Sequence, residues 1–487
     1  MIQLELSELR KQRRLAITWG ITFLVTFPLL IFLGFLMSYS QGEKMKLLLA
    51  NFYAFMTLHG LGMIMTLFSI SFSAVWYLLS TRYVKLNIKV GYFVYTTFLF
   101  GITGLAISTL IGKFAPGSNI EYPLTFKDPT WFSWSIPVSI ISLMILCISL
   151  LTGTIHVLFS LVKKLGGLSK ILGWQYFGKA KHKEELPPII LITTISFLAG
   201  ILAIAVGMSL LFIYLYQYFE KALIFDALLL NNMTFFFGDT LSNVTLFTLA
   251  GLIYTLIPEF TGRSWKTKKV LVFSWNATLL LIIFSCFQYV FLDFVQPFSI
   301  QYLGVTASHI YVIPVTIITM SGIFFQFYKA NISWDIIPLM FLMGMAGWII
   351  GSFTALVNSS LVINRVMNDT LWVPAQIHTY ALMGSVLFIL AFLFYLFPSE
   401  NNRKGSKLAK TGFWIFVSGS YGFLIMLYIG GLNSIPRNYA RYTGMGIKSM
   451  HTTAVLISQF SALFIVFILA GLFMMYFSLF AKLKRKT

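Results

Sequence analysis

Long apolar segments are the feature of this chain that most restricts its fold. A helix needs about 20 apolar residues to cross the hydrocarbon core of a membrane. Twelve segments meet that need, and they cover roughly residues 15–38, 50–80, 88–112, 132–163, 188–218, 228–257, 269–293, 300–328, 335–357, 372–397, 411–432 and 450–481. No loop between them is long enough to fold as a separate soluble domain. The sequence therefore predicts an all-α integral membrane protein, a bundle of twelve transmembrane helices that forms a single domain over residues 1–487.

The charge distribution orients these predicted spans in the membrane. The net charge is +20, and its basic residues gather in every second connection. They lie at residues 10–14, 82–89, 163–183, 263–269, 403–410 and 482–486, between connections with little charge. This alternation is the positive-inside pattern and predicts a multi-pass protein of a prokaryotic cytoplasmic membrane with both termini in the cytoplasm. The partner that the charge indicates is a lipid bilayer, and no nucleic acid is expected.

Two further predictions concern the first apolar segment and one basic loop. The first apolar segment is too long for a secretory signal and has no small-residue cleavage site, so we expect it to be retained. Arg437, Arg441 and Lys448 lie in a predicted external loop, against the positive-inside trend. They are either a harmless exception or the partners of a bound anion, for which haem propionates would serve.

Two of the six histidines, His59 and His378, lie at similar depth inside apolar segments that enter from the same side. A histidine inside a membrane is a candidate functional residue because its burial is costly. Two neutral imidazoles can bind one haem iron from both axial sides, and such an iron carries electrons without binding a gas. Small residues near each histidine, Gly60 and Gly62 in one segment and Ala375 and Gly384 in the other, would let a flat macrocycle approach the helix. The alternative, two satisfied structural histidines, stays open at this point.

The other histidines favour structural interpretations. His182 lies in a charged loop and is expected at the surface, and His156 is expected to cap or to reach the interface at the end of its span. His309 and His451 lie near span ends and are expected to be structural.

Acidic and sulfur-containing residues are scarce in the spans. Asp239 lies mid-span beside Ser242 and Asn243, either as part of a structural polar cluster or as a remnant of a proton relay or metal site. The two cysteines, Cys147 and Cys286, form neither a disulfide framework nor a Cys-x-x-Cys-His motif, so any haem must be non-covalent.

Five local motifs follow one another along the chain. They are Leu-His59-Gly-Leu-Gly-Met, Ile257-Pro258-Glu-Phe-Thr-Gly262, Val357-Asn358-Ser-Ser, Asn368-Asp-Thr-Leu-Trp372-Val-Pro-Ala-Gln-Ile-His378 and Gly431-Leu-Asn-Ser-Ile-Pro436-Arg437. In this order they resemble subunit I of the haem–copper oxidases, and most closely the B-family (ba-type) enzymes, and the likeness covers nearly the whole chain. The resemblance implies that His59 and His378 ligate one low-spin haem b, and that Arg437 binds a haem propionate.

The departures from the family pattern concern the oxygen-reducing centre. Gln376 stands where the family has the histidine of the high-spin haem. Residues 238–243, Gly-Asp-Thr-Leu-Ser-Asn, replace the family's Gly-His-Pro-x-x-Tyr, and Gln288-Tyr289 replaces its adjacent histidine pair. Copper prefers a set of imidazoles, so no copper is expected.

These observations together predict a membrane b-type cytochrome that carries electrons in a respiratory complex and has lost the oxygen-reducing centre. The resemblance implies other subunits as partners, a cupredoxin-like subunit II or a cytochrome c, and quinol as an electron carrier. Two alternatives stay open. One is an active terminal oxidase or nitric oxide reductase with unorthodox ligands, and the other is a haem-free structural or assembly subunit.

Overall fold

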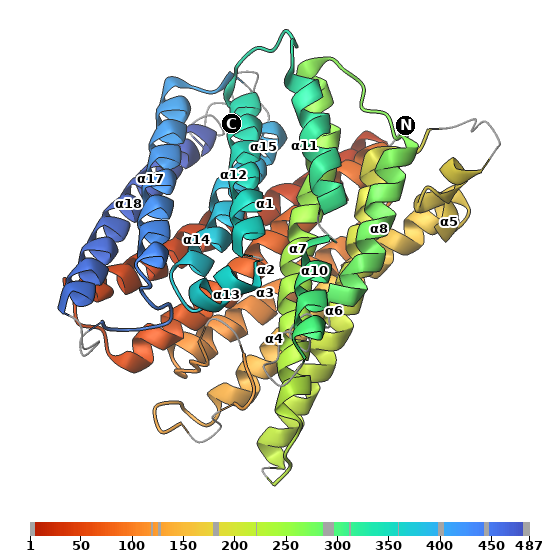
Figure 1. The fold of residues 1–487 in the computed structure, drawn as a ribbon. Helices are drawn as coiled ribbons and strands as arrows, with labels where there is room; N and C mark the ends of the chain where they lie inside the picture. The colour runs from red at the N-terminus through yellow and green to blue at the C-terminus, as the bar shows by residue number, and fades with distance from the viewer. Residues whose placement is uncertain are drawn as a thin grey trace. The chain divides into compact units, whose positions relative to one another are not determined.

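The structure is a computed structural model that describes residues 5–117, 120–124, 128–178, 185–220, 222–285, 297–310, 313–358, 360–397, 404–442 and 448–480. Its secondary structure in these ranges is helical, apart from one isolated bridge between Thr370 and Pro436. The prediction of an all-α fold is confirmed. Figure 1 shows the helices in chain order, coloured from red at the N-terminus to blue at the C-terminus.

Within the described residues, ten helices are long and apolar enough to cross a membrane. They correspond to ten of the twelve predicted spans. Their bounds are α1 (Leu6–Gln41), α2 (Leu49–Arg82), α3 (Ile88–Leu110), α4 (Ser135–Leu165), α6 (Pro188–Phe219), α7 (Ala227–Thr261), α12 (Ile336–Asn358), the run Trp372–Leu396, α17 (Lys407–Leu432) and α18 (Lys448–Phe480). The run Trp372–Leu396 consists of α14 (Trp372–His378), a π-helical segment η2 (Thr379–Ser385) and α15 (Val386–Leu396).

The two remaining predicted spans correspond to shorter helices. Span 269–293 begins as α8 (Lys269–Ser285), and its last residues lie outside the described part of the chain. Span 300–328 contains α10 (Phe298–Ile310) and α11 (Ile313–Phe327). The short helices α5 (Leu168–Ile171), η1 (Trp174–Phe177) and α13 (Leu361–Met367) lie in connections. The expected architecture of about twelve spans therefore agrees with the structure.

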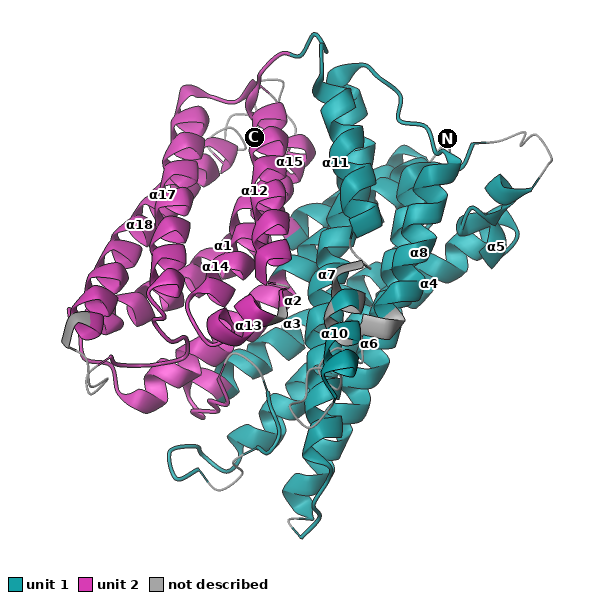
Figure 2. Cartoon of the chain, in the orientation of Figure 1, with its two compact units in different colours: residues 1–19, 67–108, 120–332 teal, residues 20–66, 109–119, 333–487 magenta. Residues whose placement is uncertain are grey.

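The chain divides into two compact units, coloured teal and magenta in Figure 2. The first unit comprises residues 1–19, 67–108 and 120–332, and the second comprises residues 20–66, 109–119 and 333–487. Helices α1 and α2 each contribute one part to each unit. The prediction that the whole chain is one domain stays a prediction.

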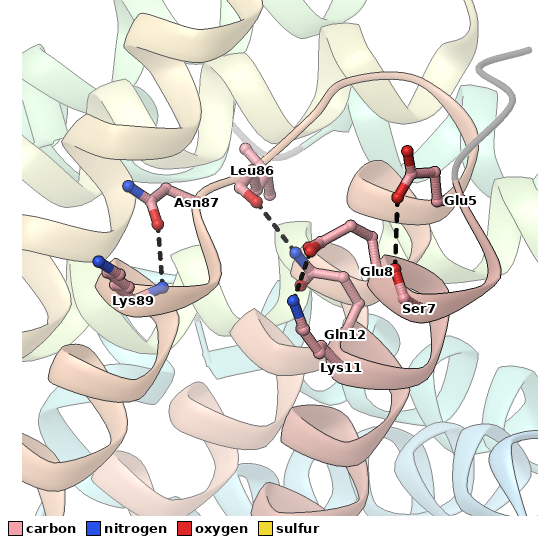
Figure 3. Close-up of polar contacts among 8 residues, drawn as sticks. All are labelled: Glu5, Ser7, Glu8, Lys11, Gln12, Leu86, Asn87 and Lys89. Atoms are coloured by element: carbon pink, nitrogen blue, oxygen red, sulfur yellow. Dashed lines mark hydrogen bonds and ion pairs between the residues drawn. The ribbon is translucent and has the colours of Figure 1, made fainter.

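In the first unit, the basic N-terminal turn of α1 is attached by a buried glutamine. Gln12 donates through Nε2 to the carbonyl of Leu86 at 2.9 Å, and its Oε1 accepts from Trp76 Nε1 at 2.9 Å. Figure 3 shows Gln12 reaching the connection after α2, with the exposed pair Lys11–Glu8 beside it. Both polar ends of the amide are therefore satisfied, which removes most of the cost of burying it.

The second unit contains α12 to α18 and the adjoining parts of α1 and α2. Helices α17 and α18 pack along each other, and glycine allows their backbones to approach closely: a Cβ on Gly471 would lie 2.5 Å from the carbonyl oxygen of Gly412. Small residues at such contacts are a common way for helices to associate in membranes, where apolar side chains gain little by leaving lipid. The segment η2 contacts α12, α14 and α15.

Candidate functional site

The second unit brings His59 on α2 and His378 at the end of α14 together, although the two residues are 319 positions apart in the chain (378 minus 59). Their ring centres are 6.0 Å apart, and the ring planes are inclined by 21°. An imidazole–metal bond is about 2 Å long, and each ring centre lies about 1 Å behind its nitrogen. Two imidazoles on opposite sides of one metal ion therefore have centres roughly 6 Å apart. The spacing fits a single iron ion between the two rings.

The hydrogen bonds of the two rings determine which nitrogen is available to a metal. His59 Nδ1 lies 2.8 Å from the carbonyl oxygen of Leu30 on α1, and His378 Nδ1 lies 2.7 Å from the carbonyl oxygen of Pro374 on its own helix. A carbonyl oxygen only accepts, so each Nδ1 must carry the proton. In a neutral imidazole this leaves the lone pair on Nε2, which is the arrangement of a metal-ligating histidine with a fixed tautomer.

The glycines near these histidines have other neighbours than the sequence suggested. A Cβ on Gly62 would lie 2.9 Å from the side chain of Leu30, and one on Gly384 would overlap the ring of Trp348. These two glycines make room for protein side chains. The glycine that faces a histidine ring is Gly34 on α1, where a Cβ would lie 3.1 Å from His59 Cε1. The sequence pattern gave no indication of Gly34, because it belongs to a different helix.

The helix that carries His378 is irregular at that residue. Regular α-helix ends at His378 and continues as the π-helical η2, a distortion that is frequent at functional sites. The ring of Phe423 on α17 lies against the His378 ring, with centres 5.4 Å apart and planes inclined by 76°. The irregular turn and the contact with Phe423 therefore both restrict the position of the His378 ring.

The N-terminal end of α14 is held by the segment that follows α17. The amide of Leu371 donates to the carbonyl of Ile435, and the amide of Arg437 donates to the carbonyl of Asp369, both at 2.9 Å. Gly431 allows this contact, since a Cβ there would lie 2.6 Å from the backbone nitrogen of Trp372. The two motifs, residues 368–378 and 431–437, thus form one local structure.

This structure places Arg437 near the start of the His378 helix. Its Nη2 lies 3.5 Å from Asp369 Oδ1, and the Arg437 side chain is 23% exposed whereas that of Asp369 is 90% exposed. Asp369 was not expected as a partner from the sequence. Among the residues that the structure describes, neither the buried Nε of this guanidinium nor the buried indole Nε1 of Trp372 has a hydrogen-bond partner. A buried donor left unpaired is costly, so both atoms suit an anionic or oxygen-bearing group of a bound molecule.

The other two basic residues of the predicted external loop differ from Arg437. Arg441 donates to the carbonyl of Leu47 at 3.3 Å, and the side chain of Lys448 lies outside the described part of the structure. Near them, burial raises the pKa of Tyr442 well above its ordinary value. The Tyr442 hydroxyl accepts a hydrogen bond from Gln41 Nε2 at 3.4 Å.

A chain of hydroxyl groups begins one residue after His378. Thr379 Oγ1 lies 3.0 Å from the hydroxyl of Tyr428 on α17, which lies 3.1 Å from Thr354 Oγ1 on α12. The ring of Tyr428 also contacts that of Trp372 edge to face, with centres 5.0 Å apart. These contacts connect α12, η2 and α17 beside the histidine, and nothing in the sequence pattern singled them out.

The residues that the sequence predicts in place of an oxygen-reducing centre are only partly described. Gln376 lies in α14, and its buried Oε1 has no hydrogen-bond partner in the described ranges. Asp239 lies on α7 in the first unit, is exposed, and its backbone carbonyl accepts from Asn243 Nδ2 at 2.8 Å. Ser242 donates to the carbonyl of Gly238 at 2.8 Å rather than to the Asp239 carboxylate.

Gln288 and Tyr289, which are also assigned to this place, lie outside the described range, and so does Cys286. In the described part of the chain, no three His, Cys, Asp or Glu side chains are grouped so as to hold a metal ion. The two imidazoles described above could still ligate an iron that a porphyrin supplies with its other four ligands.

Two further histidines, His156 and His451, form hydrogen bonds within the protein. His156 Nε2 accepts from the backbone amide of Asn87, immediately before α3, at 3.1 Å, which is a structural contact with the start of another helix. His451 Nε2 lies 2.9 Å from Glu43 Oε1, as a structural histidine would. His182 and the side chain of His309 lie outside the described part of the chain.

Comparison with known proteins finds one family model that matches most of the chain and curated relatives that match less than half of it. The family model described as "Cytochrome C and Quinol oxidase polypeptide I" matches residues 14–464. The chain is 28% identical over 219 residues to a heme-copper oxidase subunit I+III of Aeropyrum pernix, a match that covers 44% of this chain and 26% of that protein. It is 27% identical over 223 residues to a cytochrome c oxidase polypeptide 1 of Halobacterium salinarum, covering 45% and 36%. The matches thus span about a quarter to a third of the length of these relatives.

A solved structure resembles the fold over nearly its full length. A heme-copper terminal oxidase dimer determined by cryo-electron microscopy superposes with a TM-score of 0.75 and 16% sequence identity, covering 98% of this chain and 84% of the matched one. At that identity the similarity shows the fold alone.

Proposed function

Because the chain belongs to the cytochrome c and quinol oxidase polypeptide I family, we propose that it is a membrane b-type cytochrome that carries electrons through one low-spin haem. The observation that supports this most directly is the pair His59–His378, with ring centres 6.0 Å apart and each Nδ1 on a backbone carbonyl. A haem bound between two imidazoles exchanges one electron at a time and offers no free coordination position.

In this proposal the residues of the chain hold and orient the haem. His59 and His378 supply Nε2 as axial ligands, and the carbonyls of Leu30 and Pro374 keep both rings in the required tautomer. A carbonyl that accepts from Nδ1 also makes the imidazole a more basic ligand. These residues fit haem without covalent attachment.

Two donors near the start of α14 suit the propionates. Arg437 retains a buried Nε, and Trp372 retains a buried Nε1, neither with a partner among the described residues. A guanidinium pairs well with a carboxylate because its donors lie in one plane. Asp369 offsets part of the charge of Arg437, but its strong exposure weakens that effect.

The proposal also holds that the second, oxygen-reducing centre is lost. Gln376 offers an amide, which is a poor iron ligand, and Asp239 with Gln288 and Tyr289 does not provide the imidazole set that copper prefers. Without that centre the protein would pass electrons rather than reduce oxygen. Its proposed location is a prokaryotic cytoplasmic membrane. Its partners would be other respiratory subunits, a cupredoxin-like subunit II or a cytochrome c, with quinol as an electron carrier.

The test is the number and spin state of the haems in the purified chain. We expect one haem b per chain with the electron paramagnetic resonance (EPR) spectrum of a bis-histidine, low-spin ferric iron. Two haems per chain, one of them high-spin, would support an active oxidase or nitric oxide reductase instead. A protein purified in folded form without haem would support the structural-subunit alternative.

A further inference from the structure

The two histidines differ in what holds their rings. His378 donates to Pro374, four residues earlier on the same helix, so its partner lies within its own turn. His59 donates to Leu30, 29 positions away on α1. The orientation of His59 therefore depends on how closely α1 approaches α2.

That approach occurs at one glycine. Gly34 follows Leu30 by four residues, so it lies one turn further along α1 on the same face, where the Leu30 carbonyl points. A Cβ built on Gly34 would lie 3.1 Å from Cε1, 3.4 Å from Nδ1 and 3.9 Å from Nε2 of His59. One edge of the His59 ring, from Nδ1 through Cε1 to Nε2, therefore packs against the backbone of α1 at Gly34, where any other residue would have a side chain.

Any side chain at residue 34 would compete with the hydrogen bond. Carbon atoms pack without strain at about 3.5–4.0 Å, so a methyl group would push the ring away by a few tenths of an ångström. The displaced ring would lengthen or bend its bond to Leu30, which is 2.8 Å long. The hydrogen bond to this carbonyl increases the basicity of the imidazole, and a more basic ligand stabilises ferric iron over ferrous iron.

We propose that Gly34 is a positioning residue for the axial ligand His59: by lacking a side chain it allows the Leu30 carbonyl to orient the ring and thereby keeps the haem potential low. This inference rests on the proposed function, since it concerns a haem ligated by His59. It assigns to α1 a role that neither histidine motif indicates.

The matched control lies on the same helix. Gly20 is also on α1 within the second unit, and a Cβ there would lie 2.8 Å from Leu393 Cδ2, the flexible end of a side chain. Gly20→Ala adds the same methyl group to the same helix, about 20 Å from Gly34 at 1.5 Å per residue. It reports any general effect of altered α1 packing.

The experiment compares haem content, midpoint potential and EPR g-values of the unsubstituted protein, Gly34→Ala and Gly20→Ala. We expect Gly34→Ala to raise the midpoint potential and shift the g-values while the iron stays low-spin, and Gly20→Ala to change neither. Loss of haem from Gly34→Ala alone would also support the inference, because the two variants differ only in what the added methyl group meets. Unchanged properties of Gly34→Ala, or equal changes in both variants, would overturn it.

A second measurement decides the case in which both variants fail to hold haem. In the unsubstituted protein, pulsed EPR with histidine labelled at Nδ1 should find a protonated Nδ1 on both axial rings. An axial ring with an unprotonated Nδ1 would refute the inference about Gly34. A protein without any bis-histidine haem would instead refute the proposed function, so the two failures are distinguishable.

Discussion

Replacing Arg437 by glutamine should lower the midpoint potential of the proposed low-spin haem. Arg437 lies beside the start of the His378 helix, with a side chain 23% exposed and a buried Nε that has no hydrogen-bond partner among the described residues. A positive charge near the iron favours the reduced form, which is less positive. Removing that charge therefore favours the ferric form and lowers the potential.

The size of the effect follows from Coulomb's law and from the surroundings of Arg437. Two unit charges about 10 Å apart interact with roughly 1.7 kcal/mol at an effective dielectric constant of about 20. Asp369, whose Oδ1 lies 3.5 Å from Nη2, offsets part of this charge, but at 90% exposure it is well screened by water. A net change of about 1 kcal/mol remains, which for one electron is about 40 mV.

The assay is a spectroscopic redox titration of the low-spin band in three variants. Arg437→Gln should lower the midpoint potential by about 40 mV. Arg437→Lys keeps the charge and should lower it by less than half as much, and Asp369→Asn should change it little, because that carboxylate is exposed. Haem should stay bound in all three, since His59 and His378 are retained. An unchanged or raised potential in folded, haem-containing Arg437→Gln would show that Arg437 is not a propionate partner.

Four further outcomes are expected. His59→Ala and His378→Ala should each abolish the low-spin EPR signal, and a normal bis-histidine spectrum in either variant would show that the assigned ligand is wrong. The reduced protein should not bind carbon monoxide, because the iron has six ligands and Gln376 replaces the other haem ligand; a full-occupancy shift of the visible spectrum would contradict this. Elemental analysis should find no copper attributable to the pocket predicted around Asp239, and one copper per chain would revive the oxidase alternative. Gly431→Ala should lower the stability by about 1–3 kcal/mol through overpacking against Trp372, measured as a lower midpoint of thermal unfolding.

Much of the fold followed from the sequence because a membrane leaves few choices. Backbone groups cannot be hydrated in the hydrocarbon core, so a long apolar segment must satisfy them within itself as a helix. The apolar segments therefore determined the number and approximate bounds of the spans. The depth of His59 and His378 in their segments followed in the same way, because depth is counted along one helix.

The hydrogen-bond partners of the two histidines differ in whether the sequence could predict them. The partner of His378, Pro374, lies one turn earlier on the same helix and could be anticipated from the 3.6-residue period. The partner of His59, Leu30, and the glycine that admits the ring, Gly34, lie on another helix. Which residues of two apolar helices meet depends on their rotation and crossing, and neither helix encodes these alone.

For Arg437, too, the sequence predicted the location of the residue but not its partners. Its motif placed it near the predicted haem, yet the carboxylate of Asp369 and the pairing of residues 369–371 with 435–437 appeared only in the folded chain. The small residues misled for the same reason: Gly62 and Gly384 accommodate Leu30 and Trp348 rather than a macrocycle. The sequence by itself determined which helices form and which side chains could ligate iron. Only the tertiary structure decided which neighbours orient those side chains, because contacts between helices depend on the packing of all of them at once.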